Sequence, residues 1–411
     1  MENAVLHNDI DGALRARAHL VVPGGMWGHQ NAAGLPDGYP QFFASAEGCR
    51  IRDVDGRSYV DFMCSWGPVI LGHRHPEVEA AAQAQAALGD CQNGPGAVMV
   101  DLAEALVGTI AHADWVQFSK NGTDATTTCV TIARAGTGRR KLLVARGSYH
   151  GAVPWCSPSL AGVTAEDRAH ILPFDYNDIA SLDAAADRAG ADLAGILVSA
   201  FRHDLARDQE LPTPDFAARV RAICDAADAA LILDDVRAGF RLHPGGSWEP
   251  LGVRPDLSAW SKSIANGHAL AAVTGGDRFR EATTTVFSTG SFWTAAVPMA
   301  AALATLRVLA RDDGVGHMRR MGQRFHDGMA ALSERHGIAI RQTGPVQMPL
   351  VLFEDDTDFR RGNAFCIAAL DAGAYFHPRH NMFLSTAHGP ADIDAALGAA
   401  EAGFAAVAKL V

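Results

Sequence analysis

The stretch Leu231-Ile232-Leu233-Asp234-Asp235-Val236 decides the fold class, because it reads as a buried strand that ends in two acids. An uninterrupted run of branched apolar residues is typical of a strand that is covered on both faces, as in parallel sheets. A carboxylate at the end of such a strand is costly unless a cation or a hydrogen-bond donor meets it. Asp234 and Asp235 are therefore either functional or held in a helix cap or a buried ion pair.

Further short apolar runs on both sides of this stretch alternate with segments of helical periodicity. The predicted strands cover residues 116–118, 142–145, 195–198, 230–233, 257–260 and 270–273. Residues 214–229 and 124–135 show apolar side chains at the i, i+4, i+7 and i+8 spacing of one buried helix face. This alternation predicts an α/β fold with a mainly parallel sheet and helices on both of its faces.

The pattern changes after about residue 311. A long helical stretch at 318–336 leads to short strands near 346–353 and to a last helix that starts at residue 392. This change predicts a second, smaller domain. The expected division is an N-terminal segment of the small domain (1–63), a large domain (64–310) and the C-terminal part of the small domain (311–411).

The composition narrows the possible partners of the chain. Of the 411 residues, 48% are hydrophobic and 20% are charged, and the net charge of −11 argues against nucleic acid or an anionic membrane as the main partner. The seven cysteines form no CxxC pair and the histidine spacings match no common ligand set, so neither a disulfide framework nor a metal site is expected. No signal peptide and no apolar run of roughly 20 residues is apparent, so the expected location is the cytoplasm.

A lysine follows another apolar strand, in the stretch Trp260-Ser261-Lys262-Ser263-Ile264. Lys262 comes about one strand–helix–strand unit after Asp234, so we expect both side chains at the edge of the sheet where such folds bind ligands. A desolvated lysine has a depressed pKa and is nucleophilic toward carbonyls. Such a lysine beside an acid is the pair that pyridoxal phosphate (PLP) chemistry needs. The alternative is an ordinary surface lysine.

Two loops after other predicted strands carry further candidate groups. The stretch from Ser119 to Asp124 passes from a strand into a helix, and free N–H groups at a helix start bind phosphate. The alternative there is a plain N-cap, made by Thr123 or Asp124. The stretch Gly147-Ser148-Tyr149-His150-Gly151 offers an aromatic face that can stack on a flat ring, although Tyr149 can equally be a core residue.

In this order, the motifs resemble the class III (subgroup II) aminotransferases of PLP fold type I, from about residue 10 to the C-terminus. Ser65-Trp66-Gly67-Pro68 and Ser385-Thr386-Ala387-His388 are similar to the glutamate-1-semialdehyde aminomutase branch. Phe201-Arg202-His203 and Thr289-Gly290-Ser291-Phe292-Trp293 are similar to the fumonisin-detoxifying aminotransferases. The resemblance implies an α/β fold with a mainly parallel seven-stranded sheet, helices on both faces and a smaller α+β domain.

The resemblance also implies roles for individual residues. Lys262 matches the Schiff-base lysine, and Asp234 matches the partner of the pyridine nitrogen. Val236 and Tyr149 match the residues on the two faces of the cofactor ring. The other positions that match cofactor-binding residues are Asn121, Gly122, Thr123 and His150, and also Thr289, Gly290 and Ser291, which reach the phosphate of the neighbouring subunit. A homodimer with shared active sites is therefore expected.

The expected reaction is a ping-pong transamination in which Lys262 acts as general base and then as general acid. The protonated pyridine would be stabilised by Asp234, and a keto acid, pyruvate by resemblance, would accept the amino group. The expected substrate-binding residues are Trp27, Trp66, Phe292 and Trp293, with Arg379 and then Arg202 as ligands of the keto-acid carboxylate. These apolar side chains suit a bulky or aliphatic primary amine, although some of them can simply pack the core.

Two other reactions use the same cofactor residues and stay open. They are those of a glutamate-1-semialdehyde aminomutase and of a β-amino-acid aminotransferase. The aminomutase branch has an arginine shortly after Pro23-Gly24-Gly25, where this chain reads Met26-Trp27-Gly28-His29. A third possibility, a PLP-fold binding module without catalysis, is disfavoured by the retained Lys262.

Overall fold

The computed structural model describes residues 9–26, 32–36 and 38–410, and this part of the chain divides into two compact units. The large unit consists of Gly67–Leu71 and Pro76–His317. The small unit consists of the described residues up to Trp66, of Gly72–His75, and of the chain from Met318 onward. The segment Gly67–Leu71 thus belongs to the large unit, although both of its sequence neighbours belong to the small one. The domain boundaries expected from the sequence stay a prediction.

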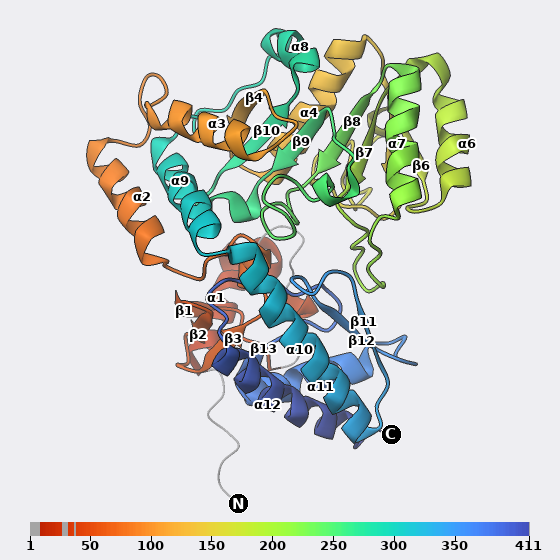
Figure 1. Cartoon of the computed structure of the whole chain (residues 1–411). Helices are drawn as coiled ribbons and strands as arrows, with labels where there is room; N and C mark the ends of the chain where they lie inside the picture. Colours follow the sequence, from red (N-terminus) through yellow and green to blue (C-terminus); the bar gives the residue numbers. More distant parts are fainter. Residues whose placement is uncertain (1–8, 27–31, 37, 411) are drawn as a thin grey trace, which may run out of the picture. The chain divides into compact units, whose positions relative to one another are not determined.

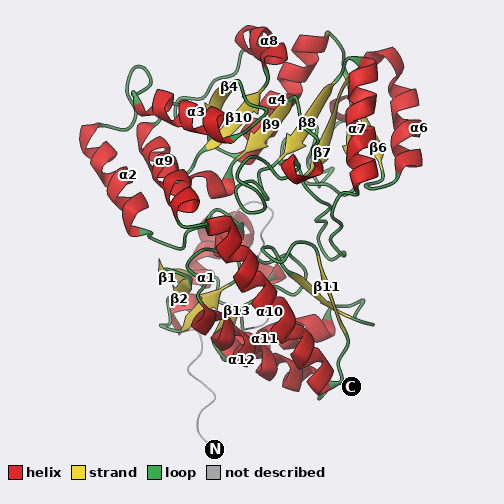
Figure 2. Ribbon diagram, viewed as in Figure 1, coloured by secondary structure: helices red, strands yellow, loops and turns green. Residues whose placement is uncertain are grey.

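A seven-stranded sheet forms the centre of the large unit (Figures 1 and 2). In spatial order its strands are β4 (Trp115–Ser119), β10 (Ala271–Gly275), β9 (Leu257–Trp260), β8 (Ala230–Asp234), β7 (Leu193–Ser199), β5 (Lys141–Ala145) and β6 (Ile171–Phe174). The neighbouring pairs from β9 to β6 are parallel, and β10 runs antiparallel to both β9 and β4. The structure confirms the predicted mainly parallel sheet and the six predicted strands.

The seventh strand, β6, is the one that the sequence pattern does not predict. It contains Pro173, and a proline inside an apolar run argues against a central strand because it has no N–H to donate. However, β6 lies at the edge of the sheet, and only Phe174 among its residues is buried. A proline is tolerated at such an edge. This short, half-exposed strand therefore lacks the continuous apolar run by which the other strands were predicted.

Helices connect and cover the strands of the large unit. They are α2 (Pro76–Leu88), α3 (Val98–Thr109), α4 (Gly122–Thr137), α5 (Ala165–Arg168), α6 (Ile179–Ala189), α7 (Pro214–Ala227), α8 (Arg280–Thr285) and α9 (Ala296–Arg311). The predicted helix at 214–229 is α7, which ends at Ala227 because Asp228 takes a left-handed conformation with φ of 49°. The predicted helix at 124–135 is α4, which begins earlier, at Gly122, because Asn121 caps it.

Alternation along the strands divides the core of the large unit into two layers. On β8, Leu231 and Leu233 pack with α6 and α7, which lie side by side in Figure 1. Ala230 and Ile232 point to the opposite face and pack with α4. Each fully buried Leu or Ile contributes about 1.5–3 kcal/mol, so a register slip of one residue would exchange the two layers at great cost. The same alternation directs Asp234 toward the α4 face.

The small unit has a four-stranded sheet, a two-stranded sheet and four α-helices among the described residues. Its strands are β1 (Phe43–Glu47), β2 (Arg50–Asp53), β3 (Ser58–Asp61) and β13 (Ala374–Tyr375) in one sheet, and β11 (Ile340–Thr343) and β12 (Leu350–Phe353) in the other. The helices are α1 (Asp9–Val21), α10 (Gly314–His336), α11 (Arg360–Asp371) and α12 (Pro390–Val407). Rings of Phe62, Phe325, Phe365 and Phe376 contact one another and form its core.

No helix within residues 9–26, 32–36 and 38–410 is both long and apolar enough to span a membrane.

Candidate active site

The carboxyl ends of β4, β5, β7, β8 and β9 lie at one edge of the large-unit sheet, because β10 runs in the opposite direction between β4 and β9. Asp234 ends β8 at this edge, and the segments that leave the edge carry Asn121, Tyr149 and Lys262. In open α/β sheets ligands bind outside the carboxyl ends of the strands. The topology therefore brings together side chains that are far apart in the sequence.

Asp234, the last residue of β8, forms a buried pair with His150. The two side chains approach to 2.6 Å between Asp234 Oδ2 and His150 Nδ1, and Asp234 Oδ1 accepts a hydrogen bond of 3.1 Å from the Val236 amide. His150 Nε2 is buried and has no hydrogen-bond partner among the described residues. The carboxylate is thus oriented from two sides, by the histidine and by the backbone that follows it.

The loop before α4 meets Val236 closely. Asn121 caps the helix, because its Oδ1 accepts from the Asp124 amide at 3.0 Å while Asp124 accepts from the Asn121 amide at 3.1 Å. The N-cap is therefore Asn121 and neither Thr123 nor Asp124. A Cβ atom on Gly122 would lie 2.7 Å from Val236 Cγ1, so that only glycine fits there. The first turn of α4 thereby lies next to the strand end that carries Asp234.

Lys262 follows β9 and opens a short 3-10 helix, η6 (Lys262–Ala265), with a positive φ of 44°. This conformation costs a non-glycine residue about 1–2 kcal/mol. The pKa of Lys262 is lowered to about 7, mainly by burial and also by the charges of Arg237 and Arg241, whereas Asp234 acts in the opposite direction. Near neutral pH a large fraction of such an amine is uncharged and nucleophilic.

Arg241 and Asn266 anchor the segment Gly67–Leu71 beside this lysine. Arg241 is fully buried, and its Nη2 donates hydrogen bonds to the carbonyls of Gly67 and Val69. Asn266, just after η6, accepts with its Oδ1 from the amides of Ile70 and Leu71 at 3.0 and 2.8 Å. These bonds explain why this short segment belongs to the large unit.

Tyr149 lies in the loop that follows β5. The same loop contains His150. Tyr149 is 41% exposed, so it is not the core tyrosine of the alternative interpretation. Arg237 lies near the same loop, since its pKa is lowered to about 10 by burial while the charges of Asp234, Tyr149 and Asp204 act against that shift. Arg237, Arg241 and Asp204 are not among the site residues expected from the sequence. The sequence did carry a sign of the two arginines. Arg237 and Arg241 are charged residues in a stretch after Asp235 that otherwise consists of small and apolar residues.

Asp235 points away from Asp234 and is almost fully buried, and Ser247 donates hydrogen bonds to it from both its amide and its hydroxyl. Burial raises the pKa of Asp235 from 3.8 to about 6, although the Ser247 bonds lower it. A raised folded-state pKa means that the stabilisation is complete below about pH 4 and is lost as the pH rises through about 6.

We therefore expect the unfolding free energy of the wild type, relative to Asp235→Asn, to fall by about 3 kcal/mol between about pH 4 and about pH 7. Because all other carboxyl groups titrate in both proteins, the difference isolates Asp235. Urea denaturation at several pH values measures it. A difference that does not change with pH would show that Asp235 ionises at its ordinary pKa.

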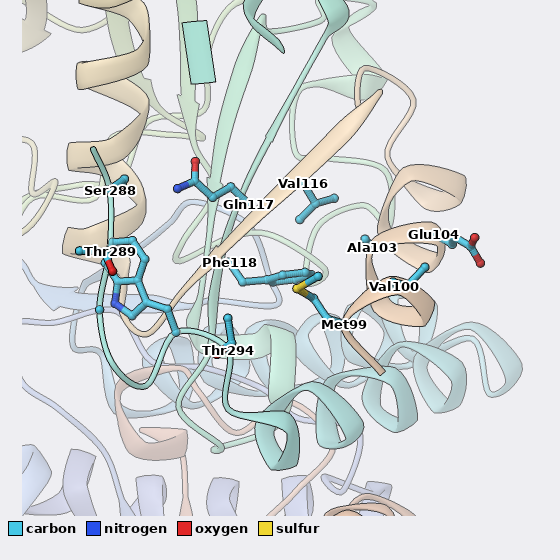
Figure 3. Close-up of a pocket in the computed structure, with 12 residues that line it drawn as sticks. Met99, Val100, Ala103, Glu104, Val116, Gln117, Phe118, Ser288, Thr289 and Thr294 are labelled. Atoms are coloured by element: carbon cyan, nitrogen blue, oxygen red, sulfur yellow. The ribbon is translucent and has the colours of Figure 1, made fainter. Parts of the chain in front are cut away.

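The loop with Thr289, Gly290 and Ser291 contacts other parts of the large unit. Thr289 and Gly290 line a pocket of about 420 Å³ between this loop, α3 and β4, in which Met99 and Phe118 extend toward each other (Figure 3). Trp293 lies over Gly290 and lines the same pocket. Neither Lys262 nor Asp234 is among the residues that line this pocket.

The candidate substrate residues that the structure describes are divided between the small unit and the large unit. Trp27 lies outside the described residues. In the small unit, the Trp66 ring meets the His377 and His380 rings edge-on at 5.5 and 5.1 Å, and Arg379 Cζ lies 5.5 Å from the centre of a phenylalanine ring. Arg379 Nε is buried without a hydrogen-bond partner among the described residues.

The remaining candidates belong to the large unit. Arg202 is bound within its own loop, with Nη1 2.7 Å from Glu210 Oε1. Phe292 is 65% exposed. The structure thus gathers Asp234, Lys262, Tyr149 and the start of α4 in one place.

Comparisons with known proteins agree with this geometry. A family model described as aminotransferase class-III matches residues 36–388. Aminopentol aminotransferase from Sphingopyxis macrogoltabida is 48% identical over 396 residues, which cover 96% of this chain and 94% of that protein. 3-Aminobutyryl-CoA aminotransferase from Cloacimonas acidaminovorans is 30% identical over 405 residues, with 97% of each covered. The structure of the FumI protein of Sphingopyxis sp. MTA144 in a PLP form matches with a TM-score of 0.96 and 48% identity, covering 97% of this chain and 96% of that one.

Proposed function

Because the chain belongs to the class III aminotransferases, which use PLP, we propose that it moves the amino group of a bulky or aliphatic primary amine to a keto acid such as pyruvate. The observation that carries the proposal is the 48% identity to an aminopentol aminotransferase over 96% of the chain. The placement of Asp234 and Lys262 at one edge of the sheet supports it. The cytoplasmic location expected from the sequence stays a prediction.

The residues at this edge fit PLP. The start of α4 offers free N–H groups for a phosphate, and Gly122 keeps the space beside Val236 open. Asp234 provides a buried, oriented carboxylate for a pyridine nitrogen, and Lys262 provides an amine of low pKa. When bound, PLP supplies an aldehyde carbon that condenses with amines and a ring that delocalises negative charge.

Five residues at this edge of the sheet have proposed roles in the reaction. Lys262 Nζ would bind the cofactor aldehyde and, once released, would take a proton from the amino-bearing carbon of the substrate and deliver it, as a general acid, to the former aldehyde carbon of the cofactor. Asp234 holds a proton on the pyridine nitrogen, and His150 fixes the orientation of that carboxylate through the 2.6 Å contact. Val236 and the exposed ring of Tyr149 hold the two faces of the cofactor.

The proposal includes a homodimer in which Thr289, Gly290 and Ser291 serve the neighbouring active site. Phe287 and Phe292 flank this loop and are 95% and 65% exposed. Large contiguous patches of exposed apolar side chains mark surfaces that another molecule covers, and these two rings stand at both ends of the loop assigned to the neighbouring active site. Analytical ultracentrifugation tests the assembly, and a fully active monomer would contradict it.

Arg379 is our first choice for the keto-acid carboxylate. The Nε atoms of Arg379 and Arg202 both lack a hydrogen-bond partner among the described residues, but Arg202 is also bound to Glu210 through Nη1 at 2.7 Å. We expect Arg379→Ala to raise KM for pyruvate by about 10- to 100-fold, the value of one charge-assisted hydrogen bond. Oxidation of the amine in a single half-reaction should persist. Arg335→Ala, which removes an exposed ion pair with Glu401 in the same unit, is the control. An unchanged KM for pyruvate would remove Arg379 from the proposal.

A panel of amine donors with pyruvate, followed by detection of alanine, tests the function as a whole. We expect bulky and aliphatic amines without a carboxylate to be the best donors. Absence of alanine with every donor would contradict the proposal.

The two alternative reactions are separated by their substrates. An aminomutase isomerises glutamate-1-semialdehyde without any added keto acid. A β-amino-acid aminotransferase prefers donors that carry a carboxylate, and it stays as the second candidate. The relative that is 30% identical is named for 3-aminobutyryl-CoA, whose acyl group is a thioester, so it does not support that preference. Amines with and without a carboxylate, compared at equal concentration, distinguish it from the proposed function.

A further inference from the structure

The turn that carries Lys262 has a left-handed residue at each end. Lys262, the first residue of η6, has a φ of 44°, and Asn266, directly after its last residue, has a φ of 45°. Residues other than glycine rarely take this conformation, because Cβ then lies too close to the following carbonyl oxygen. Strained residues persist only where the surrounding structure holds them, and they cluster at functional sites. Contacts around η6 must therefore keep the turn in this shape.

The side chain of Asn266 makes two of these contacts. Its Oδ1 accepts hydrogen bonds from the amides of Ile70 and Leu71, at 3.0 and 2.8 Å, and Leu71 lies 195 residues earlier in the chain. Asn266 is only 5% exposed, and Ile70 and Leu71 are buried as well. In such a dry environment the loss of the acceptor is costly, because buried N–H groups require a partner. The far end of the lysine turn is thus fixed to the segment Gly67–Leu71.

The other end of the turn is fixed through Ser263, the residue after Lys262. The hydroxyl of Ser263 donates a hydrogen bond of 2.7 Å to the Gly239 carbonyl, and Ser263 is almost fully buried. The residue before the lysine, Ser261, donates to the carbonyl of Leu270 at 3.0 Å. The lysine itself thus stands between two buried serines whose hydroxyl groups bind different parts of the backbone.

Arg241 completes a ring of hydrogen bonds around this turn. It lies two residues after Gly239 and donates to two carbonyls of the segment Gly67–Leu71, the same segment whose amides bind Asn266. The ring thus runs from η6 through Asn266 to this segment. From there it returns through Arg241 and Gly239 to Ser263 in η6, and all of these residues belong to the large unit. Opening the ring would let the turn relax.

The shape of the turn determines where the Lys262 amine lies. A change of φ from positive to negative rotates the Cα–Cβ bond, so the same side chain would leave the backbone in another direction. In the observed shape the amine is desolvated, since burial, and then the charges of Arg237 and Arg241, lower its pKa. The nucleophile is therefore placed by the contacts that its neighbours make.

We infer that Asn266 is a positioning residue for the proposed transamination, because its bonds to the Ile70 and Leu71 amides hold the left-handed turn from which Lys262 reaches the cofactor. Asn266 acts through Lys262, and its role requires no contact with the substrate or the cofactor. The inference rests on the proposed function, since it assumes that Lys262 is the reacting amine. A misplacement of about 1 Å can lower a rate about 100-fold, so the role is measurable.

The test compares two substitutions that separate the side chain of Asn266 from its backbone conformation. Asn266→Gly suits the left-handed conformation but removes the acceptor. It should lower kcat with pyruvate by about 100-fold, while KM for both substrates changes by less than about threefold. Asn266→Asp keeps an acceptor of the same size and should recover at least about tenfold of that loss.

Asn177→Gly is the matched control for the first substitution. Asn177 also has a positive φ, of 63°, and its Oδ1 accepts from the Thr213 amide at 3.0 Å. The same change therefore removes a similar bond at a similar backbone conformation, on another loop of the large unit. It should leave kcat unchanged.

A second readout does not depend on turnover. The apoenzyme is mixed with PLP at pH 7, portions are quenched with borohydride, and peptide mass spectrometry follows the label on Lys262. Attachment should be about 100-fold slower in Asn266→Gly than in the wild type and unchanged in Asn177→Gly. Thermal unfolding is measured in parallel. A merely structural role would lower the unfolding temperature and leave the attachment rate of the folded protein unchanged.

Each outcome decides the inference. An Asn266→Gly variant with wild-type kcat and attachment rate would overturn it, because Asn266 would then only permit the turn, and so would an Asn266→Asp variant as slow as Asn266→Gly. If Asn266→Gly does not fold, Ser263→Ala opens the same ring at its other end and should slow attachment by about tenfold; an unchanged rate would contradict the inference. The proposed function fails differently, because the wild type would then carry no label on Lys262.

Discussion

Replacing Lys262 with alanine is expected to lower kcat for transamination by about 10⁴-fold or more, because it removes both the covalent anchor and the general base. The measurement is alanine formation from an amine and pyruvate. Borohydride treatment of the cofactor-loaded wild type should label Lys262, and the variant should carry no label. Lys141→Ala, which removes an amine that binds two backbone carbonyls of the same unit, is the control. Labelling of a different lysine in the wild type would refute the role of Lys262.

The same lysine sets a pH dependence that can be measured in the apoenzyme. Its pKa is lowered from 10.5 to about 7, so the neutral amine becomes available as the pH rises toward 7. The rate of reaction with PLP should therefore rise about tenfold per pH unit below about pH 7 and level off above it. A rate that continues to rise toward 10.5 would show that the amine is not desolvated.

Asp234→Asn is expected to reduce kcat/KM by about 10³-fold, since an amide of the same shape cannot hold a proton on the pyridine nitrogen. The remaining Oδ1 of the asparagine can still accept from His150 or from the Val236 amide, so the fold should be kept. Circular dichroism and thermal unfolding check this point. Asp192→Asn, which makes the same change at an exposed pair with Arg140, is the matched control. Activity within about threefold of the wild type would exclude this role.

The fold was largely accessible to sequence reasoning, because its signals are local. The run Leu231-Ile232-Leu233 predicts a doubly covered strand, and the structure confirms it as β8 in the middle of the sheet. The reversed direction of β10 has no such signal, since an apolar strand of the same length can run either way. The edge strand β6 was missed for a related reason, because its proline is permitted only by its position.

The site was accessible only in part. Asp234 and Lys262 stand at strand ends, and the rule that parallel strands share a carboxyl edge predicts that they approach each other. The partnership of Asp234 with His150 and the anchoring of Gly67–Leu71 by Arg241 join segments far apart in the sequence. No periodicity or local spacing carries such contacts.

By itself, the sequence determined the class of the protein: buried strands alternating with helices, and a lysine and an acid that each follow a buried strand. These features depend on neighbouring residues and on the two-residue and 3.6-residue periods of the backbone. The helix expected between these two strands was wrong, because β8 and β9 are joined by a segment whose only helix is the 3-10 helix η5 (Glu249–Leu251). Only the tertiary structure decided the electrostatics of the site. The low pKa of Lys262 arises from burial and from arginines on other segments, and burial is a property of the packed chain.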